Sequence, residues 1–299
     1  MRSMHNVFQK YGKLPPKEPD VVSWKTLCID LIGPYTLGKP AKIHPKTKKV
    51  LRESTEIILH CLTMIDPATG WFEIAEVEGA SADVIANTLE QAWLTRYPWP
   101  TELIADRGRE FMNEVPDMLR DDYGIFVKKI TTRNPQANSM VERCHKTLSE
   151  RVNSQRLVDK HSLPIRDGWR GLLSSLAFAM RATAHATNRA TPSQLVFGRD
   201  HIHNVGFEAD WLYIKARKQR RIFQNNMKEN ATRREHEYQV GDQVAVKQYK
   251  HRKFGSDHFH GPFEVEKVYD NGTVKLRRDM NGNVQHQMWN IRNLKPCKA

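Results

Sequence analysis

Cysteine is scarce in this 299-residue sequence, with four residues spread at positions 28, 61, 144 and 297. No two of them have the spacing of a zinc knuckle, and nothing suggests a disulfide framework, so a reducing compartment is the default expectation. No apolar run approaches the ~20 residues that a membrane span requires, so no membrane partner is expected. The sequence also has no P-loop, no Rossmann fingerprint and no internal repeat. These absences exclude small disulfide-stapled domains and the common nucleotide-binding classes.

Acidic residues are outnumbered, because 34 Asp and Glu face 47 Lys and Arg, which gives a net charge of +13. Residues 201–299 hold 19 basic and 11 acidic residues, a net +8, which leaves +5 for residues 1–200. A basic surplus in the last third of the chain suits a polyanionic partner, most simply nucleic acid. Charge alone leaves open a basic protein without a specific partner.

The hydrophobic pattern predicts an α/β core over residues 24–200, with the order β-β-β-α-β-α-β-α-α. A basic excursion at 39–54 is expected to be an exposed hairpin loop. Short apolar runs predict strands at 24–33, 55–66, 71–78, 101–106 and 125–132. Helical spacing predicts helices at 81–97, 110–123 and 169–187, with one more beginning near Glu142.

The remaining sequence predicts two further parts. Residues 201–237 are charged and helical in composition, so they are expected to form a helical connector. Residues 238–299 show short strands with Gly-rich turns, and the Asn-Gly pair in "DNGT" is a strong hairpin signal, so a small β-barrel is expected. Residues 1–23 are rich in Pro and Lys, as a linker is.

Three carboxylates stand out by their positions. Asp30 lies inside an apolar strand, where it must be paired, neutral, or exposed at a sheet edge beside a cation. Asp106 ends a strand, and Glu142 opens a helix after 35 intervening residues, following the loop in "RNPQANSMVERCHKTL". Three converging carboxylates repel one another, and a pair of divalent ions bridged by Asp and Glu is the usual apparatus of phosphoryl transfer. Taken singly, Asp106 and Glu142 are better explained as ordinary surface or capping residues.

The segments "LCIDLIGP", "IADRGREFMN" and "NPQANSMVERCHKTL" resemble the three motifs of retroviral and long-terminal-repeat retrotransposon integrases, the D,D(35)E enzymes, in their gypsy-type variant. "TPSQLVFGRD" resembles the usual end of that catalytic core, and "GPFEVEKVYDNGTVKL" with "NIRNLKP" resembles the SH3-like module of the same group. The resemblance implies a ribonuclease-H-like core with a mixed five-stranded sheet and helices, then the helical connector, then an SH3-like β-barrel that binds DNA.

The resemblance also implies an activity. Asp30, Asp106 and Glu142 would bind two Mg²⁺ or Mn²⁺ ions and catalyse 3′-end processing of element DNA and its strand transfer into target DNA. The implied partners are element ends, target DNA and further copies of the chain, and the implied compartment in a eukaryote is the nucleus, reached through the cytoplasm. DNA contacts are expected at Gln136, Asn138, Arg143, Lys146, Arg220 and Arg221. For Lys146 the alternative is an i,i+4 ion pair with Glu142, and for Gln136 and Asn138 it is plain turn chemistry.

The sequence departs from this group in one respect. Integrases of the group usually begin with a His-His-Cys-Cys zinc module, and these 299 residues contain none. Residues 1–23 are therefore expected to be a linker remnant that follows a missing zinc module. Two alternatives remain open: a catalytically inactive DNA-binding relic of an integrase, and a ribonuclease H, which the 35-residue spacing and the C-terminal strands disfavour.

Overall fold

The computed structural model describes residues 9–37, 42–43, 50–52, 57–79, 81–105, 114–129, 145–146, 149–150, 165–247, 259–277 and 288–297. The chain divides into two compact units. One, here the core unit, consists of Asp20–Ile130 and Pro135–Lys215, and the other, the C-terminal unit, consists of Met1–Pro19, Thr131–Asn134 and Ala216–Ala299. Each unit is described below by itself.

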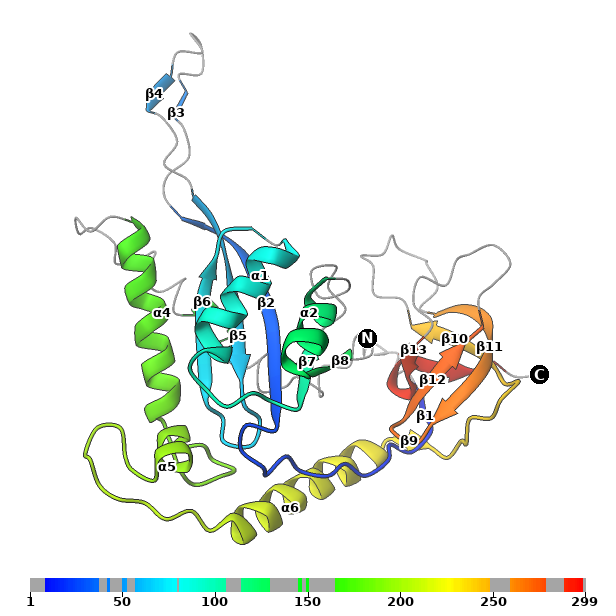
Figure 1. Cartoon of the computed structure of the whole chain (residues 1–299). Helices are drawn as coiled ribbons and strands as arrows, with labels where there is room; N and C mark the ends of the chain where they lie inside the picture. Colours follow the sequence, from blue (N-terminus) through cyan, green and yellow to red (C-terminus); the bar gives the residue numbers. More distant parts are fainter. Residues whose placement is uncertain are drawn as a thin grey trace, which may run out of the picture. The chain divides into compact units, whose positions relative to one another are not determined.

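The core unit contains a mixed five-stranded sheet in the order β6-β5-β2-β7-β8 (Figure 1). The first three strands pair antiparallel, and β7 and β8 run parallel to β2. The strands are β2 (Thr26–Leu37), β5 (Ile57–Ile65), β6 (Phe72–Val77), β7 (Glu102–Ala105) and β8 (Phe126–Lys129). The mixed sheet expected from the sequence is confirmed, with β2 at its centre.

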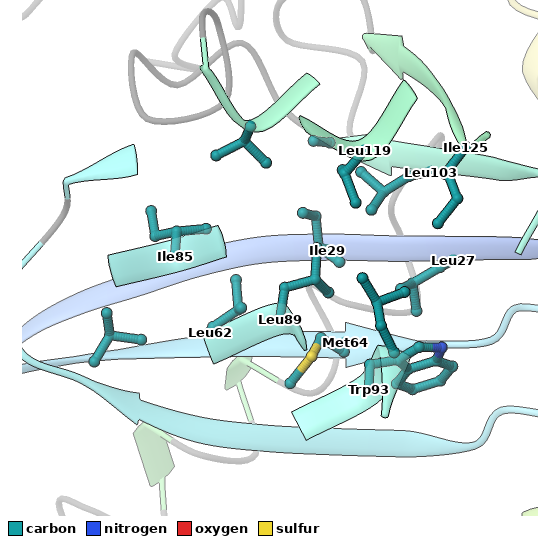
Figure 2. Close-up of a cluster of buried hydrophobic side chains, with 14 of the residues drawn as sticks. Leu27, Ile29, Leu62, Met64, Ile85, Leu89, Trp93, Leu103, Leu119 and Ile125 are labelled. Carbon is teal, nitrogen blue, oxygen red and sulfur yellow. The ribbon is translucent and has the colours of Figure 1, made fainter. Parts of the chain in front are cut away.

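Helices cover both faces of this sheet because its strands alternate apolar side chains between two buried layers. Leu27, Ile29, Leu62 and Met64 pack on one face against residues of α1 (Ala82–Leu89), η1 (Glu90–Leu94) and α2 (Glu114–Tyr123). Figure 2 shows Ile85, Leu89, Trp93 and Leu119 from these helices over the strand residues. On the other face, Cys28, Ile32, Cys61 and Ile65 pack against α4 (Ile165–Ala182).

Several boundaries differ from the prediction for local reasons. The first strand was expected to stop at Gly33, yet β2 continues to Leu37 through a register shift between Ile32 and Tyr35, where Gly33 takes a φ of +130°. A bulge of this kind lets a Gly-Pro pair stay within a paired strand. The helix expected at 81–97 changes to a π-helix over Glu90–Leu94, and α4 ends at Ala182 rather than 187.

Strands β3 (Lys42–Ile43) and β4 (Val50–Arg52) pair antiparallel, which confirms a hairpin in the basic excursion.

The "TPSQLVFG" segment forms a short, fully capped helix. In α5 (Pro192–Phe197), the Thr191 hydroxyl accepts from the Gln194 amide while the Gln194 side chain accepts from the Thr191 amide, a capping box. Pro192 follows the cap, and Gly198 ends the helix in the left-handed conformation with a φ of 65°. The sequence thus determines both ends of this helix locally.

The C-terminal unit contains an antiparallel five-stranded sheet in the order β13-β12-β11-β10-β14. The predicted Asn-Gly hairpin is confirmed between β11 and β12, where Gly272 has a φ of 73°. The strands are β10 (Gln243–Lys247), β11 (Phe259–Tyr269), β12 (Thr273–Leu276), β13 (Met288–Asn290) and β14 (Leu294–Pro296), with the 3₁₀ turn η4 (Ile291–Asn293) between the last two. Helix α6 (Trp211–Asn230) precedes them and contains the boundary between the units.

Residues near the N-terminus belong to this second unit. Strand β1 (Lys10–Tyr11) pairs in parallel with β9 (Arg233–Arg234), and Leu14 is buried in the apolar cluster of the C-terminal sheet. The Asn230 side chain accepts from the Leu14 amide at 2.8 Å and donates to its carbonyl at 3.2 Å. The sequence assigned these residues to a linker, whereas here they contribute a strand and a core side chain.

The described part of the chain has no helix with the length and apolar character needed to cross a membrane.

Candidate active site

Asp30 lies on β2, the central strand of the mixed sheet, opposite Thr63 of β5. Strand alternation places it on the same face as Cys28 and Ile32, the face that α4 covers. Its side chain keeps 26% exposure, so the carboxylate is neither fully buried nor at a sheet edge. Of the three settings considered for a carboxylate in an apolar strand, the sheet-edge setting is therefore wrong.

Thr63 and His145 are neighbours of Asp30. The Thr63 hydroxyl lies 2.9 Å from the main-chain carbonyl oxygen of Asp30 and 3.1 Å from Nε2 of His145. The other ring nitrogen, Nδ1, lies 3.8 Å from Oδ2 of Asp30. Three elements meet here, because His145 comes from a helical stretch in which residues 145, 146, 149 and 150 are described.

The His145 ring is neutral at physiological pH. Burial penalises the charged imidazolium and lowers the pKa of His145 to about 4. Although the ring and the Asp30 carboxylate lie within ion-pair distance, the contact is therefore not a salt bridge near pH 7. An uncharged ring with one free nitrogen can accept a hydrogen bond or bind a cation.

The second expected carboxylate follows the end of β7. Strand β7 is parallel to β2, and its last residue, Ala105, is paired with Ile29. The residues that follow Ala105 and Ile29 in the sequence are Asp106 and Asp30. Asp106 lies outside the described residues, as do Glu142, Gln136, Asn138 and Arg143.

The described basic candidates are solvent-exposed. Lys146 has 78% of its side chain exposed, and its Nζ lies 3.8 Å from Oε1 of Glu150, one turn further along the helix. Arg220 and Arg221 are exposed on α6, in the C-terminal unit. Of the residues predicted from the sequence, only Asp30 has its surroundings described in the core site.

Sequence reasoning missed His145. The signal was available, because His145 follows Glu142 by three positions, close to one helical turn, and so would share a helix face with it. Spacing in the sequence alone could not reveal that His145 contacts Thr63 on β5.

The other buried acids of the core unit have structural partners. Asp66 accepts hydrogen bonds from the Ala68 amide, the Thr69 hydroxyl and, at 3.3 Å, the Trp24 amide. Glu73 pairs with Arg181 and accepts from the Tyr97 hydroxyl. Within the described residues, no three His, Cys, Asp or Glu side chains could hold a metal ion together. Among the described residues, the carboxylate oxygen of Asp30 and the ring nitrogen of His145 are both donors of a kind that divalent cations accept.

Comparison with known proteins agrees with these features. No protein-family model matches the chain. The Retrovirus-related Pol polyprotein from transposon 412 of Drosophila melanogaster is 23% identical over 245 residues, which are 74% of this chain and 19% of that protein. The Pro-Pol polyprotein of feline foamy virus is 26% identical over 201 residues, which are 62% of this chain and 16% of that protein. The chain thus spans less than a fifth of the length of these relatives.

A solved structure shares the fold. A chain in the simian T-cell lymphotropic virus intasome, determined in complex with the PP2A regulatory subunit B56 gamma, superimposes with a TM-score of 0.59 at 11% identity. The match covers 98% of this chain and 85% of that chain. The relatives are thus Pol polyproteins of retroviruses and a retrotransposon, and the fold is that of a retroviral intasome chain. These findings confirm the resemblance to the retroviral integrase superfamily that the sequence motifs indicated.

Proposed function

We propose that this chain is an integrase that processes the 3′ ends of retroelement DNA and joins them to target DNA. The observation that carries the proposal is the register at the centre of the mixed sheet. Ile29 of β2 is paired with Ala105 of β7, and the residue that follows each of them in the sequence is one of the two aspartates of the motif. The similarity to retroviral and retrotransposon Pol polyproteins supports the same assignment.

In this proposal, Asp30, Asp106 and Glu142 hold two Mg²⁺ or Mn²⁺ ions. The bound ions would supply Lewis-acid chemistry, activating the attacking oxygen and stabilising the leaving oxygen in both steps. The exposed fraction of the Asp30 carboxylate leaves one side of it open to a cation and a DNA phosphate. His145 and Thr63 fix the orientation of the Asp30 segment, so that the carboxylate does not need to reorganise when DNA arrives.

DNA is the proposed partner for the basic surfaces. Lys146 is exposed on the helix that carries His145, within reach of a phosphate beside the site. Gln136, Asn138 and Arg143 would contact DNA beside the carboxylates, and Arg220 and Arg221 would contact its backbone from α6. The strands of the C-terminal unit, with the 3₁₀ turn before the last one, are proposed to form an SH3-like barrel that also binds DNA. By analogy with the intasome that shares the fold, we propose that the chain assembles with further copies of itself, in the nucleus of a eukaryotic host.

The proposal is tested by a strand-transfer assay. The purified chain is incubated with Mn²⁺, a plasmid target and a short pre-processed duplex from the element's own terminal repeat. Wild type is compared with Glu142→Gln and with the matched control Glu150→Gln, which makes the same change two turns further along. We expect joined products from wild type and the control, and background levels from Glu142→Gln.

DNA binding is measured in parallel by fluorescence anisotropy at several salt concentrations. Glu142→Gln should bind DNA as wild type does, because the change removes only one carboxylate charge. Wild-type amounts of product from Glu142→Gln would refute the metal assignment. Binding by all three proteins without any product would favour a DNA-binding relic over an active integrase.

A further inference from the structure

The protonation of the His145 ring follows from its neighbour. The Thr63 hydroxyl has a single proton, and the main-chain oxygen of Asp30, 2.9 Å away, can only accept. That proton is therefore committed to Asp30, so in the 3.1 Å contact with His145 the Thr63 oxygen accepts and Nε2 donates. The ring is held in the tautomer that carries its proton on Nε2.

This tautomer turns a lone pair toward the carboxylate. A proton on Nδ1 would form a hydrogen bond with the facing carboxylate, yet Nδ1 lies 3.8 Å from Oδ2 of Asp30, so the geometry fits an Nδ1 that carries a lone pair. That distance is too long for a hydrogen bond, and neither atom supplies a proton to the other. Two electron-pair donors held opposite each other in a partly buried site are stabilised by a cation that lies between them. An ion with bonds of about 2.1 Å to each ligand spans donors up to roughly 4.2 Å apart, so one ion can reach both.

The hydrogen bonding beyond the ring also matches that of a metal-binding histidine. Such a histidine almost always donates its second ring N–H to a fixed acceptor, which sets the tautomer and the ring orientation. Thr63 plays that part here, and it is fixed in turn because it is buried and bonded to the main chain of the residue that would share the ion.

We propose that Nδ1 of His145 and Oδ2 of Asp30 bind the same divalent cation, which gives the active site a nitrogen ligand in addition to its carboxylates. This inference rests on the proposed function, because it adds a ligand to the same site. Its consequence is metal selectivity. Carboxylate oxygens suit Mg²⁺, whereas an imidazole nitrogen shifts the preference toward transition metals. The chain should therefore favour Mn²⁺ over Mg²⁺ by about tenfold more than the same site without the imidazole.

The test measures metal binding directly, without turnover. Tag-free full-length chain is loaded with Mn²⁺, and electron spin-echo envelope modulation detects whether a ¹⁴N nucleus is bound to the ion. Three proteins are compared with wild type: His145→Gln, Asp30→Asn, and the control His203→Gln, which makes the same change at an exposed histidine. Circular dichroism verifies that each variant is folded, and the loss of the free Mn²⁺ signal gives each affinity.

We expect nitrogen modulation in wild type and in His203→Gln, and its loss in His145→Gln. Mg²⁺ competition should show that the advantage of Mn²⁺ over Mg²⁺ falls about tenfold in His145→Gln. Nitrogen modulation that persists in His145→Gln would overturn the inference. Asp30-dependent Mn²⁺ binding without nitrogen modulation would overturn the inference and leave the proposed function intact. Wild-type Mn²⁺ affinity in Asp30→Asn would overturn both.

A second pair of variants tests the role of Thr63 as the positioning residue. Thr63→Val keeps the shape and removes the hydroxyl, so the ring loses the acceptor for its Nε2 proton, and Mn²⁺ affinity should fall about tenfold or more. Thr63→Ser keeps the hydroxyl and should retain most of that affinity. Equal Mn²⁺ affinities in the two variants would contradict the tautomer argument, because both differ from wild type at the same buried position.

Discussion

Asp30 and Arg233 are charged residues in the two units, and their surroundings differ. Asp30 keeps 26% of its side chain exposed, with the nearest ring nitrogen at 3.8 Å. The Arg233 side chain is fully buried, and it donates to the main-chain carbonyls of Gly12, Tyr11 and Ile291 at 2.5, 2.7 and 3.2 Å. Its second guanidinium nitrogen lies 3.6 Å from Glu229, which also pairs with Arg292 at 2.7 Å.

The comparison separates charge that stabilises the fold from charge that is open to a ligand. A buried guanidinium that donates to main-chain carbonyls contributes to the fold and is out of reach of DNA. A partly exposed carboxylate remains accessible from solvent. In a chain of net charge +13, basic residues alone therefore do not identify the DNA-binding surface.

Replacing Arg233 should have the largest effect on stability. Arg233→Met removes the side-chain donor that three main-chain carbonyls share, and we expect the C-terminal unit to lose about 3–5 kcal/mol. The neighbour Arg234 is exposed on the same short strand, so Arg234→Met should change stability by less than about 0.5 kcal/mol. Chemical denaturation followed by circular dichroism measures both. Equal effects from the two variants would show that Arg233 is not the structural centre of this unit.

A smaller loss is expected from Leu14. Its side chain is 6% exposed within the apolar cluster of the C-terminal sheet, so Leu14→Ala should destabilise that unit by about 2–3 kcal/mol. Val22→Ala, at an exposed apolar position, is the control and should be nearly neutral. The unfolding transition of the C-terminal unit reports the result. An unchanged transition in Leu14→Ala would mean that residues 9–17 add nothing to that unit.

The smallest effect is a dependence on pH at His145. As the pH falls, the unfolded chain binds a proton at this histidine near pH 6.5, whereas the folded chain does so only near pH 4. The stability from the neutral ring is therefore fully present above pH 6.5 and is lost between 6.5 and 4. Between pH 7 and pH 5 the loss should be about 2 kcal/mol larger in wild type than in His145→Gln.

This measurement is made with a chelator present, so that metal binding does not contribute, and His203→Gln serves as the exposed-histidine control. The slope for His203→Gln should equal that of wild type. A wild-type slope in His145→Gln would show that the ring titrates alike in the folded and unfolded chain.

The sequence predicted the regular elements well where local signals are strong. Short apolar runs identified β5 and β6, and Asn271-Gly272 identified the hairpin between β11 and β12. The sequence predicted element boundaries less well where a contact between residues distant in the sequence determines them. Gly33 and Pro34 indicate a strand end, yet pairing of Tyr35, Thr36 and Leu37 with β5 carries the strand past them.

The candidate site shows the same division. Asp30 could be identified as a candidate because burying an unpaired carboxylate in an apolar strand costs free energy. The roles of Thr63 and His145 depend on a cross-strand register and on a helix from a later part of the chain, which one-dimensional spacing does not define. Tyr11 and Leu14 were read as linker because a two-residue strand has no periodicity to detect.

The pairing of β1 with β9 has a consequence for synthesis on the ribosome. Tyr11 and Arg234 are register partners across more than two hundred positions, and the core unit lies between them in the sequence. Contacts with such separation form late, and domains generally begin to fold as their residues emerge. The core unit can therefore fold while the nascent N-terminal residues still wait for a partner. The C-terminal unit, which includes residues translated before the core unit, should therefore be the last to become complete.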